Sequence, residues 1–414
     1  MNWKGLTLLI VLNLLSALHA TPVEKRKSMQ LHTSNISSIK VIQEQVLVPG
    51  GSHAGLWLGP DLLFIPGTPP DNLHVFFAAS DRKGGDSVQR RMHFTAPQPP
   101  ENEKTFSAWY KAWKLEDYPE SLQERTDANG FRFVPTFNWK FHPASGKVIA
   151  FGHVLRHRGL KLSNHLEHCA ISYSVYDPAN RSFAPWKSFR IKIDGQEKPS
   201  VAYGQRVDLP NGDILLPFST VKTLEGWNSI RWCGTARCRF DGETVSVIEI
   251  GNLVTHSVPR GFVEPSMAEH NGTFYMTLRA QDGHSHVTTS KDGLTWKKPH
   301  PWCWNNGDAI PMDQTMTKFV SHSEGLFLVY TRITKNNTKV FRHRAPVFIA
   351  RIDPETVRLI RKTESTVLGN NGLPLGNFSV HEVSPRETWV TSPEWDRTGK
   401  DVSCDNRLAR IIWK

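Results

Sequence analysis

The sequence predicts an all-β protein, a six-bladed β-propeller with a short helical insertion. Strand-like segments recur along the 414 residues, and several open at a turn glycine such as Gly146 or Gly212. Most of them are followed by a second strand-like run, which is the pattern of antiparallel hairpins. The units repeat every 50 to 75 residues or so, at the upper end of what propeller repeats show, and six of them fit the chain.

The elements follow in order along the chain. First strands of the six units are expected at residues 73–80, 146–155, 212–220, 272–279, 325–332 and 387–391. Second strands are expected at residues 170–176, 235–240, 286–290, 346–352 and 408–413. The run 39–48 is predicted to close the ring onto the last unit. A five-bladed propeller or a β-sandwich is the alternative.

The N-terminal 20 residues have the pattern of a signal peptide. Lys4 precedes a mostly apolar run at residues 8–18, and Ala20 ends it. The run is short for a bilayer span, so stable membrane insertion is not expected. We expect cleavage after residue 20 and a secreted or periplasmic protein. Residues 21–414 are expected to form one monomeric propeller domain, because no Pro/Ser-rich linker interrupts them.

Residues 101–128 break the strand pattern. Phe106, Trp109, Tyr110 and Trp113 are spaced three, one and three residues apart, which is typical of one face of a helix. We expect this insertion to pack its aromatic rings onto the rim of the propeller, with sugar stacking as the functional alternative.

Charge and cysteines limit the class of partner. The net charge of +11 favours an acidic oligo- or polysaccharide over a neutral one, although a generally basic surface would give the same value. Nucleic acid is not expected, since no clustered Lys/Arg run is present. Five cysteines are too few for a disulfide scaffold, and Cys233 and Cys238 are candidates for a local bridge.

The stretch 290–296 reads Ser-Lys-Asp-Gly-Leu-Thr-Trp. Ser290, Asp292 and Thr295 have side-chain oxygens that bond the backbone of a tight turn, and Gly293 supplies a free dihedral. Trp296 is expected to cover the turn. This stretch resembles the Asp box, or BNR repeat, of the sialidase superfamily, although it is one residue shorter between Ser and Trp. The resemblance implies a folding element of a propeller blade and no catalytic role.

A charge pair precedes this turn. Glu264-Pro265-Ser266 is followed by Arg279 on the next expected strand, in the order and at the spacing found in sialidases. The resemblance implies that Glu264 is the catalytic Glu and that Arg279 binds the substrate carboxylate. It also implies a further substrate arginine on a later blade, for which Arg344 is the best match and Arg342 the second. The alternative is an ordinary ion pair at a blade end.

The sequence departs from the family at two places. Phe64-Ile65-Pro66 resembles the motif of the family's first arginine but lacks the arginine. No tyrosine follows Tyr330, where the family's nucleophilic tyrosine would lie. Asp81 is the candidate for the family's acid/base aspartate, with Asp86 as the alternative.

Other chemistry-bearing residues are expected where strands end. Arg332 and Glu394 are candidates for substrate binding, because an arginine fork holds a carboxylate in two places. His153 is a candidate base within a histidine-rich stretch that also contains His142, His157, His165 and His168, with Tyr203 or Tyr173 as the acid. No metal is expected, because His153 and His157 would come close enough to share an ion only on a helix, and no cofactor is expected either.

These observations predict a secreted carbohydrate-active enzyme, a sialidase-like glycoside hydrolase that acts on an acidic, carboxylate-bearing glycan. A polysaccharide lyase with a histidine base is one alternative. A propeller that binds glycans without cleaving them is the second, and the missing tyrosine favours it. A structural or protein-interaction propeller, in which these charges are incidental, is the third.

Overall fold

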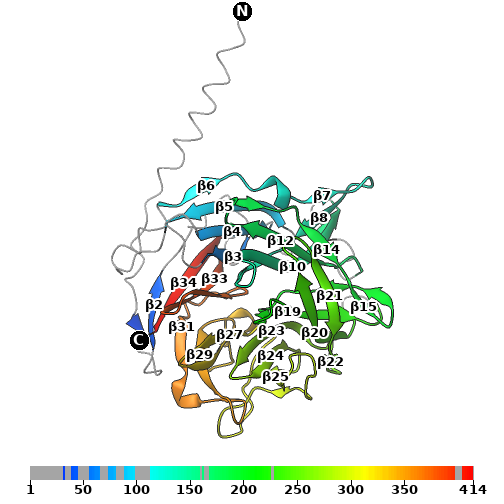
Figure 1. Ribbon diagram of the computed structural model, residues 1–414. Coiled ribbons are helices and arrows are strands. Elements are labelled where there is room, and N and C mark those ends of the chain that lie inside the picture. The colour runs from blue at the N-terminus through cyan, green and yellow to red at the C-terminus, as the bar shows by residue number, and fades with distance from the viewer. Residues whose placement is uncertain are drawn as a thin grey trace, which may run out of the picture. The chain divides into compact units, whose positions relative to one another are not determined.

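The computed structural model describes residues 31–32, 39–44, 56–65, 73–80, 88–97, 112–158, 161–162, 167–224, 228–396 and 403–413. Residues 31–414 form one compact unit in which nearly all regular structure is antiparallel β-sheet (Figure 1). Within the described ranges no helix is long and apolar enough to cross a bilayer. The predicted signal peptide lies outside these ranges, so cleavage and export stay predictions.

The first two sheets come from the first half of the chain. The first sheet contains β3 (Leu56–Phe64), β4 (Leu73–Ser80), β5 (Val88–Ala96) and β6 (Lys114–Glu116). The second contains β7 (Arg125–Thr126), β8 (Phe131–Pro135), β9 (Asn138–His142), β10 (Lys147–Arg158), β11 (Lys161–Leu162), β12 (Ile171–Asp177), β13 (Ser182–Phe183) and β14 (Lys187–Phe189). A two-stranded ribbon, β15 (Ile191–Ile193) and β16 (Gln196–Lys198), follows it.

The third and fourth sheets form the middle of the chain. The third contains β17 (Ser200–Val201), β18 (Val207–Asp208), β19 (Ile214–Val221), β20 (Arg231–Phe240), β21 (Val245–Ile250) and β22 (Val254–Thr255). The fourth contains β23 (Val263–His270), β24 (Thr273–Arg279), β25 (Ser285–Ser290) and β26 (His300–Pro301).

The last two sheets include the strands nearest both ends. The fifth contains β27 (Lys318–His322), β28 (Gly325–Tyr330), β29 (Val347–Asp353), β30 (Arg358–Leu359) and β31 (Ser365–Leu368). The remaining sheet joins β32 (Ser379–Ser384), β33 (Glu387–Asp396) and β34 (Ser403–Trp413) to β1 (Leu31–His32) and β2 (Ile39–Glu44). Three-residue 3₁₀ turns lie at η2 (Glu120–Leu122), η3 (Phe341–His343) and η4 (Arg361–Thr363).

The sheets follow one another around a ring. β3 lies against β9, β10 against β17, β19 against β23, β23 against β27, and β27 against β32, while β3 also lies against β32, β33 and β34. A buried apolar cluster fills each junction, such as Leu215 with Met276 between the third and fourth sheets. Strands of all these sheets surround a cavity of about 460 Å³.

The prediction of an all-β propeller is therefore confirmed. The predicted number of six blades is corrected to five. Each of these five blades is built from one continuous stretch of chain. The remaining sheet is composite, since β2 from the N-terminal side pairs with β34, with Ile39 opposite Trp413. The sequence pattern predicted this pairing, because it assigned the run 39–48 to ring closure.

The predicted first strands are found as β4, β10, β19, β24, β28 and β33. Each lies second from the axis of the ring, behind a shorter or less regular inner strand that the sequence pattern did not reveal. The inner position of the third sheet holds only the two-residue strands β17 and β18, which are too short to show an alternating pattern.

Two local predictions are wrong. The described part of the expected helical insertion, residues 112–128, contains β6, η2 and β7 and no α-helix, because β6 pairs with β5 as the outer strand of the first sheet. Phe106, Trp109 and Tyr110 lie outside the described residues. Cys233 and Cys238 form no bridge: both are free on one strand, where residues five apart face opposite sides.

The turn at residues 290–296 has the expected hydrogen bonds. The Asp292 carboxylate accepts from the backbone N–H groups of Leu294 (2.8 Å) and Thr295 (2.6 Å), and the Ser290 and Thr295 hydroxyls donate to it. Gly293 has φ of +73°, and a Cβ there would lie 2.4 Å from the Leu215 side chain. Buried Trp296 donates from Nε1 to the Thr235 hydroxyl of the third sheet, so the turn ties two sheets together.

We expect Asp292→Ala to lower the free energy of unfolding by about 2 kcal/mol, because two backbone donors lose a charged acceptor. Chemical denaturation at pH 7 measures this, with exposed Lys298→Ala as the matched control. The Thr295 amide, above all, holds the pKa of Asp292 below its usual range. The stabilisation is therefore complete above about pH 4 and declines as the pH falls. A difference between variant and wild type that grows toward pH 2 would contradict this.

Candidate functional site

Glu264 lies at a bulge at the start of β23. The pairing with β24 shifts register between Val263 and Ser266, so Glu264 and Pro265 stand out of the ladder. Glu264 has φ of +52°, a left-handed conformation that is strained for a non-glycine residue. Pro265 lacks an N–H and suits a bulge for that reason. The bulge directs the Glu264 carboxylate to Arg279, whose Nη1 donates to Oε2 at 2.7 Å.

A half-buried glutamine holds the strand behind this bulge. The Gln205 backbone N–H donates to the Ser266 hydroxyl (3.0 Å), which donates in turn to Gln205 Oε1 (2.9 Å). Gln205 Nε2 donates to the Phe319 carbonyl of β27 at 2.8 Å. At the preceding residue, a Cβ on Gly204 would lie 1.7 Å from the Pro265 carbonyl oxygen, so only glycine fits. The bulge is thus fixed by the sheets on both sides.

Several arginines act on the Glu264 carboxylate. Arg279 and Arg344 are 6% and 5% exposed, and the Glu264 side chain keeps 23% of its exposure. Burial by itself raises the pKa of Glu264, but Arg279, followed by Arg260 and Arg344, outweighs it and holds the pKa at about 2. Glu264 is therefore ionised at neutral pH.

Arg231 and Arg260 are two further arginines whose charges interact with Glu264. Neither was assigned a role from the sequence. Burial, and then the charge of Arg260, lower the pKa of Arg231 to about 10. The Arg231 backbone N–H donates to the Arg260 carbonyl at 3.0 Å. Arg260 and Gly261 both have left-handed φ values, +67° and +60°. The Arg260-Gly261 dipeptide is the local sequence feature that indicates a turn here. It does not predict the contact of Arg260 with Arg231 of β20.

Arg344 reaches the site from the fifth sheet. It follows η3, in a loop closed by buried Asn337, whose Nδ2 donates to the Arg332 and Ala345 carbonyls at 2.9 Å. The Arg344 guanidinium lies 5.6 Å from the Trp395 ring centroid. Arg342 lies one residue inside η3 with φ of +52°, and its guanidinium is 5.0 Å from the ring of exposed Phe341.

Arg332 and Glu394 are engaged by partners of their own. Arg332 donates from Nε and Nη2 to the Glu364 carboxylate, both at 2.7 Å, and lies over the Phe348 ring. Glu394 is 6% exposed and accepts from Arg407 at 2.8 Å. Both side chains are therefore paired within the described residues, and their role in substrate binding stays a prediction.

Three described histidines within residues 142–168 have separate partners. His142 lies within hydrogen-bonding distance of Ser145 and the Gly212 carbonyl, and His153 lies 3.1 Å from the Thr136 hydroxyl. His168 contacts Arg156 instead. His165 and Asp81 lie outside the described residues, so the role of Asp81 stays a prediction. The structure thus brings together Glu264, Arg279 and Arg344 among the predicted site residues.

Comparisons with known proteins support the fold. No family model matches the sequence, and neither does any curated protein. A Trypanosoma rangeli sialidase in complex with 2,3-difluoro-KDN matches with a TM-score of 0.59 at 12% identity, over 89% of this chain and 58% of that chain. This chain therefore spans less than two thirds of the sialidase.

Two further structures match over most of this chain. A protein of unknown function from Dyadobacter fermentans has a TM-score of 0.57 at 13% identity, over 92% of this chain and 100% of its own. The endosialidase of phage phi92 has a TM-score of 0.53 at 9% identity, over 90% and 69%. Likenesses at such identities show the fold alone. The chain has the sialidase-like β-propeller fold.

Proposed function

We propose that the protein is a sialidase-like glycoside hydrolase that acts on an acidic, carboxylate-bearing glycan at the Glu264 site. The observation that supports this proposal is the hydrogen bonding of the Arg279 guanidinium. Its Nη1 is bonded to Glu264, whereas its buried Nε has no hydrogen-bond partner in the part of the chain that the structure describes. A buried donor without a partner is costly, and a ligand carboxylate that pairs with the Arg279 guanidinium would offset this cost.

Arg344 provides the second cation for the same carboxylate. After Arg279 and Arg260, its charge contributes to the low pKa of Glu264, and it comes from a different sheet than Arg279. Two guanidinium groups from neighbouring sheets suit a planar carboxylate better than one lysine would, since each presents a rigid fork. Another Trypanosoma rangeli sialidase structure of the same fold is a complex with sialic acid, an acidic sugar. The net charge of +11 would favour the approach of such substrates.

Glu264 would serve as the anionic group of the reaction. Glycoside hydrolysis passes through an oxocarbenium-like transition state, which a nearby carboxylate stabilises. With a pKa of about 2, Glu264 is ionised and suits this role, whereas it does not suit that of a general acid. Asp81 remains the proposed acid, from the resemblance of the sequence to sialidases.

Binding without hydrolysis is the second candidate, because no tyrosine follows Tyr330 in the sequence. Tyr330 itself is fully buried and donates to Glu364 at 2.6 Å, and burial raises its pKa, so it does not suit the role of a nucleophile. The comparisons do not favour the lyase alternative. Export as a monomer, and the assignment of residues 290–296 as a shortened Asp box, belong to the same proposal.

We expect Arg279→Ala to weaken the binding of sialic acid by about tenfold or more, because a charged hydrogen bond is lost. Isothermal titration calorimetry measures the affinity. Arg344→Lys keeps the charge but loses the fork, and should weaken binding less. Arg386→Ala is the matched control, since Arg386 is exposed on the turn between β32 and β33. Unchanged affinity in a folded Arg279→Ala protein would contradict the proposed carboxylate site.

We expect Glu264→Gln to lower the turnover of a fluorogenic sialoside by about 100-fold or more while sialic acid still binds. Glu249→Gln, an exposed carboxylate on β21, is the control. Wild-type protein that binds sialosides but never cleaves them would favour the binding candidate. Equal turnover by wild type and Glu264→Gln would show that the catalytic group lies elsewhere.

The low pKa of Glu264 predicts how stability varies with pH. Because the folded-state pKa of about 2 lies below the unfolded value, ionised Glu264 stabilises the fold fully above about pH 4.5. This contribution declines as the pH falls toward 2. The difference in unfolding free energy between wild type and Glu264→Gln should therefore be constant from pH 5 to 7 and should shrink below pH 4, as measured by urea denaturation. A difference that is the same at pH 3 and pH 7 would contradict the low pKa.

A further inference from the structure

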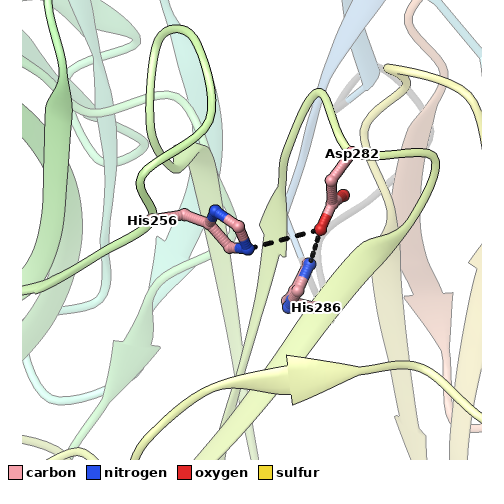
Figure 2. A group of neighbouring side chains, drawn as sticks. All are labelled: His256, Asp282 and His286. Atoms are coloured by element: carbon pink, nitrogen blue, oxygen red, sulfur yellow. Dashed lines mark hydrogen bonds and ion pairs between the residues drawn. The ribbon is translucent and has the colours of Figure 1, made fainter.

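A second cluster of polar side chains lies beside the loop that leads to Glu264. His256 follows β22, Asp282 lies in the turn between β24 and β25, and His286 lies on β25 (Figure 2). The His286 Nε2 is 2.7 Å from Asp282 Oδ2, and the His256 Nε2 is 3.4 Å from the same oxygen. One potential ligand atom from each side chain lies within 4.8 Å of the other two.

The separations fit the first shell of a transition metal. Bonds of about 2.0–2.1 Å to zinc place neighbouring tetrahedral ligands roughly 3.3 Å apart. The distance of 3.4 Å between His256 and Asp282 already has this value, and a small rotation of the Asp282 or His286 side chain would open the 2.7 Å contact. Two imidazoles and one carboxylate are ligands that a divalent transition metal accepts and that calcium or magnesium does not favour.

The surroundings hold the three side chains in place. The His284 backbone N–H donates to Asp282 Oδ1 at 3.1 Å, which leaves Oδ2 directed at the two histidines. The Phe262 ring packs against both imidazoles, with centroid distances of 5.4 Å to His256 and 5.1 Å to His286. His286 is 4% exposed, whereas His256 and Asp282 are half-buried, so an ion could enter from one side.

We propose that His256, Asp282 and His286 form a binding site for a divalent transition metal ion of the zinc type, with a water molecule as the fourth ligand. The ion would connect two sheets, because His256 follows a strand of the third sheet and the other two ligands belong to the fourth. The connecting loop carries Arg260 and ends at Phe262, two residues before Glu264. Metal binding would therefore fix the loop that leads to the site, whatever reaction that site performs.

The proposal is tested on the full chain, free of any histidine tag and treated with a chelator. Titration with Zn²⁺ against a chromogenic chelator gives stoichiometry and affinity, and Co²⁺ absorption reports the coordination number. The variants are His256→Ala, Asp282→Asn and, as the matched control, His300→Ala, which removes an exposed histidine of the same sheet. Because His256 lies in a half-buried loop position, its variant is the one expected to keep the fold, and circular dichroism checks this.

We expect one Zn²⁺ per chain, a tetrahedral Co²⁺ spectrum, and no comparable binding of Ca²⁺. His256→Ala and Asp282→Asn should each weaken Zn²⁺ binding by about 100-fold or more, since even the loss of an outer-shell partner costs about 10–100-fold. His300→Ala should bind as the wild type does. Wild-type protein without stoichiometric Zn²⁺ binding, or a folded His256→Ala protein with wild-type affinity, would overturn the proposal. Catalytic activity is not part of this readout, so failure here is distinct from failure of the proposed function.

Discussion

The ion pair between Arg279 and Glu264 is the interaction on which the candidate site depends. It joins the end of β24 to a bulge at the start of β23, and it holds a strained glutamate where its carboxylate meets several guanidinium groups. Without this ion pair, the charged Glu264 side chain at the bulge would have no fixed orientation. The Arg279 Nη1 is used in this way, whereas its buried Nε has no hydrogen-bond partner within the described part of the chain.

The propeller brings the other charges to this pair from separate sheets. Arg231 belongs to the third sheet, Arg344 to the fifth, and Trp395, which lies beside Arg344, to the composite sheet. Gln205 and Gly204 keep the inner strands close enough for these side chains to meet. The proposed metal site would add a further connection between the third and fourth sheets, next to the segment that carries Arg260.

Local sequence patterns predicted those structural features that neighbouring residues alone determine. The second strand of each sheet is long and apolar, so its pattern is visible, and the Asp292 turn needs only neighbouring residues. The inner strands β17 and β18 are only two residues long, too short to show an alternating pattern, and they lie against strands of the neighbouring sheets, which no local pattern records. Glu264 and Arg279 were found through their spacing in a resemblance to sialidases. Arg231 and His256 were missed, because only the packing of sheets brings them to their partners.

The most direct measurement of the central claim is a crystal structure of the protein with sialic acid bound. We expect the sugar carboxylate to lie within hydrogen-bonding distance of the Arg279 and Arg344 guanidinium groups, with Glu264 still paired to Arg279 Nη1. A sugar that is bound at saturating concentration elsewhere on the propeller, without contact to Arg279 or Arg344, would contradict the proposed carboxylate site.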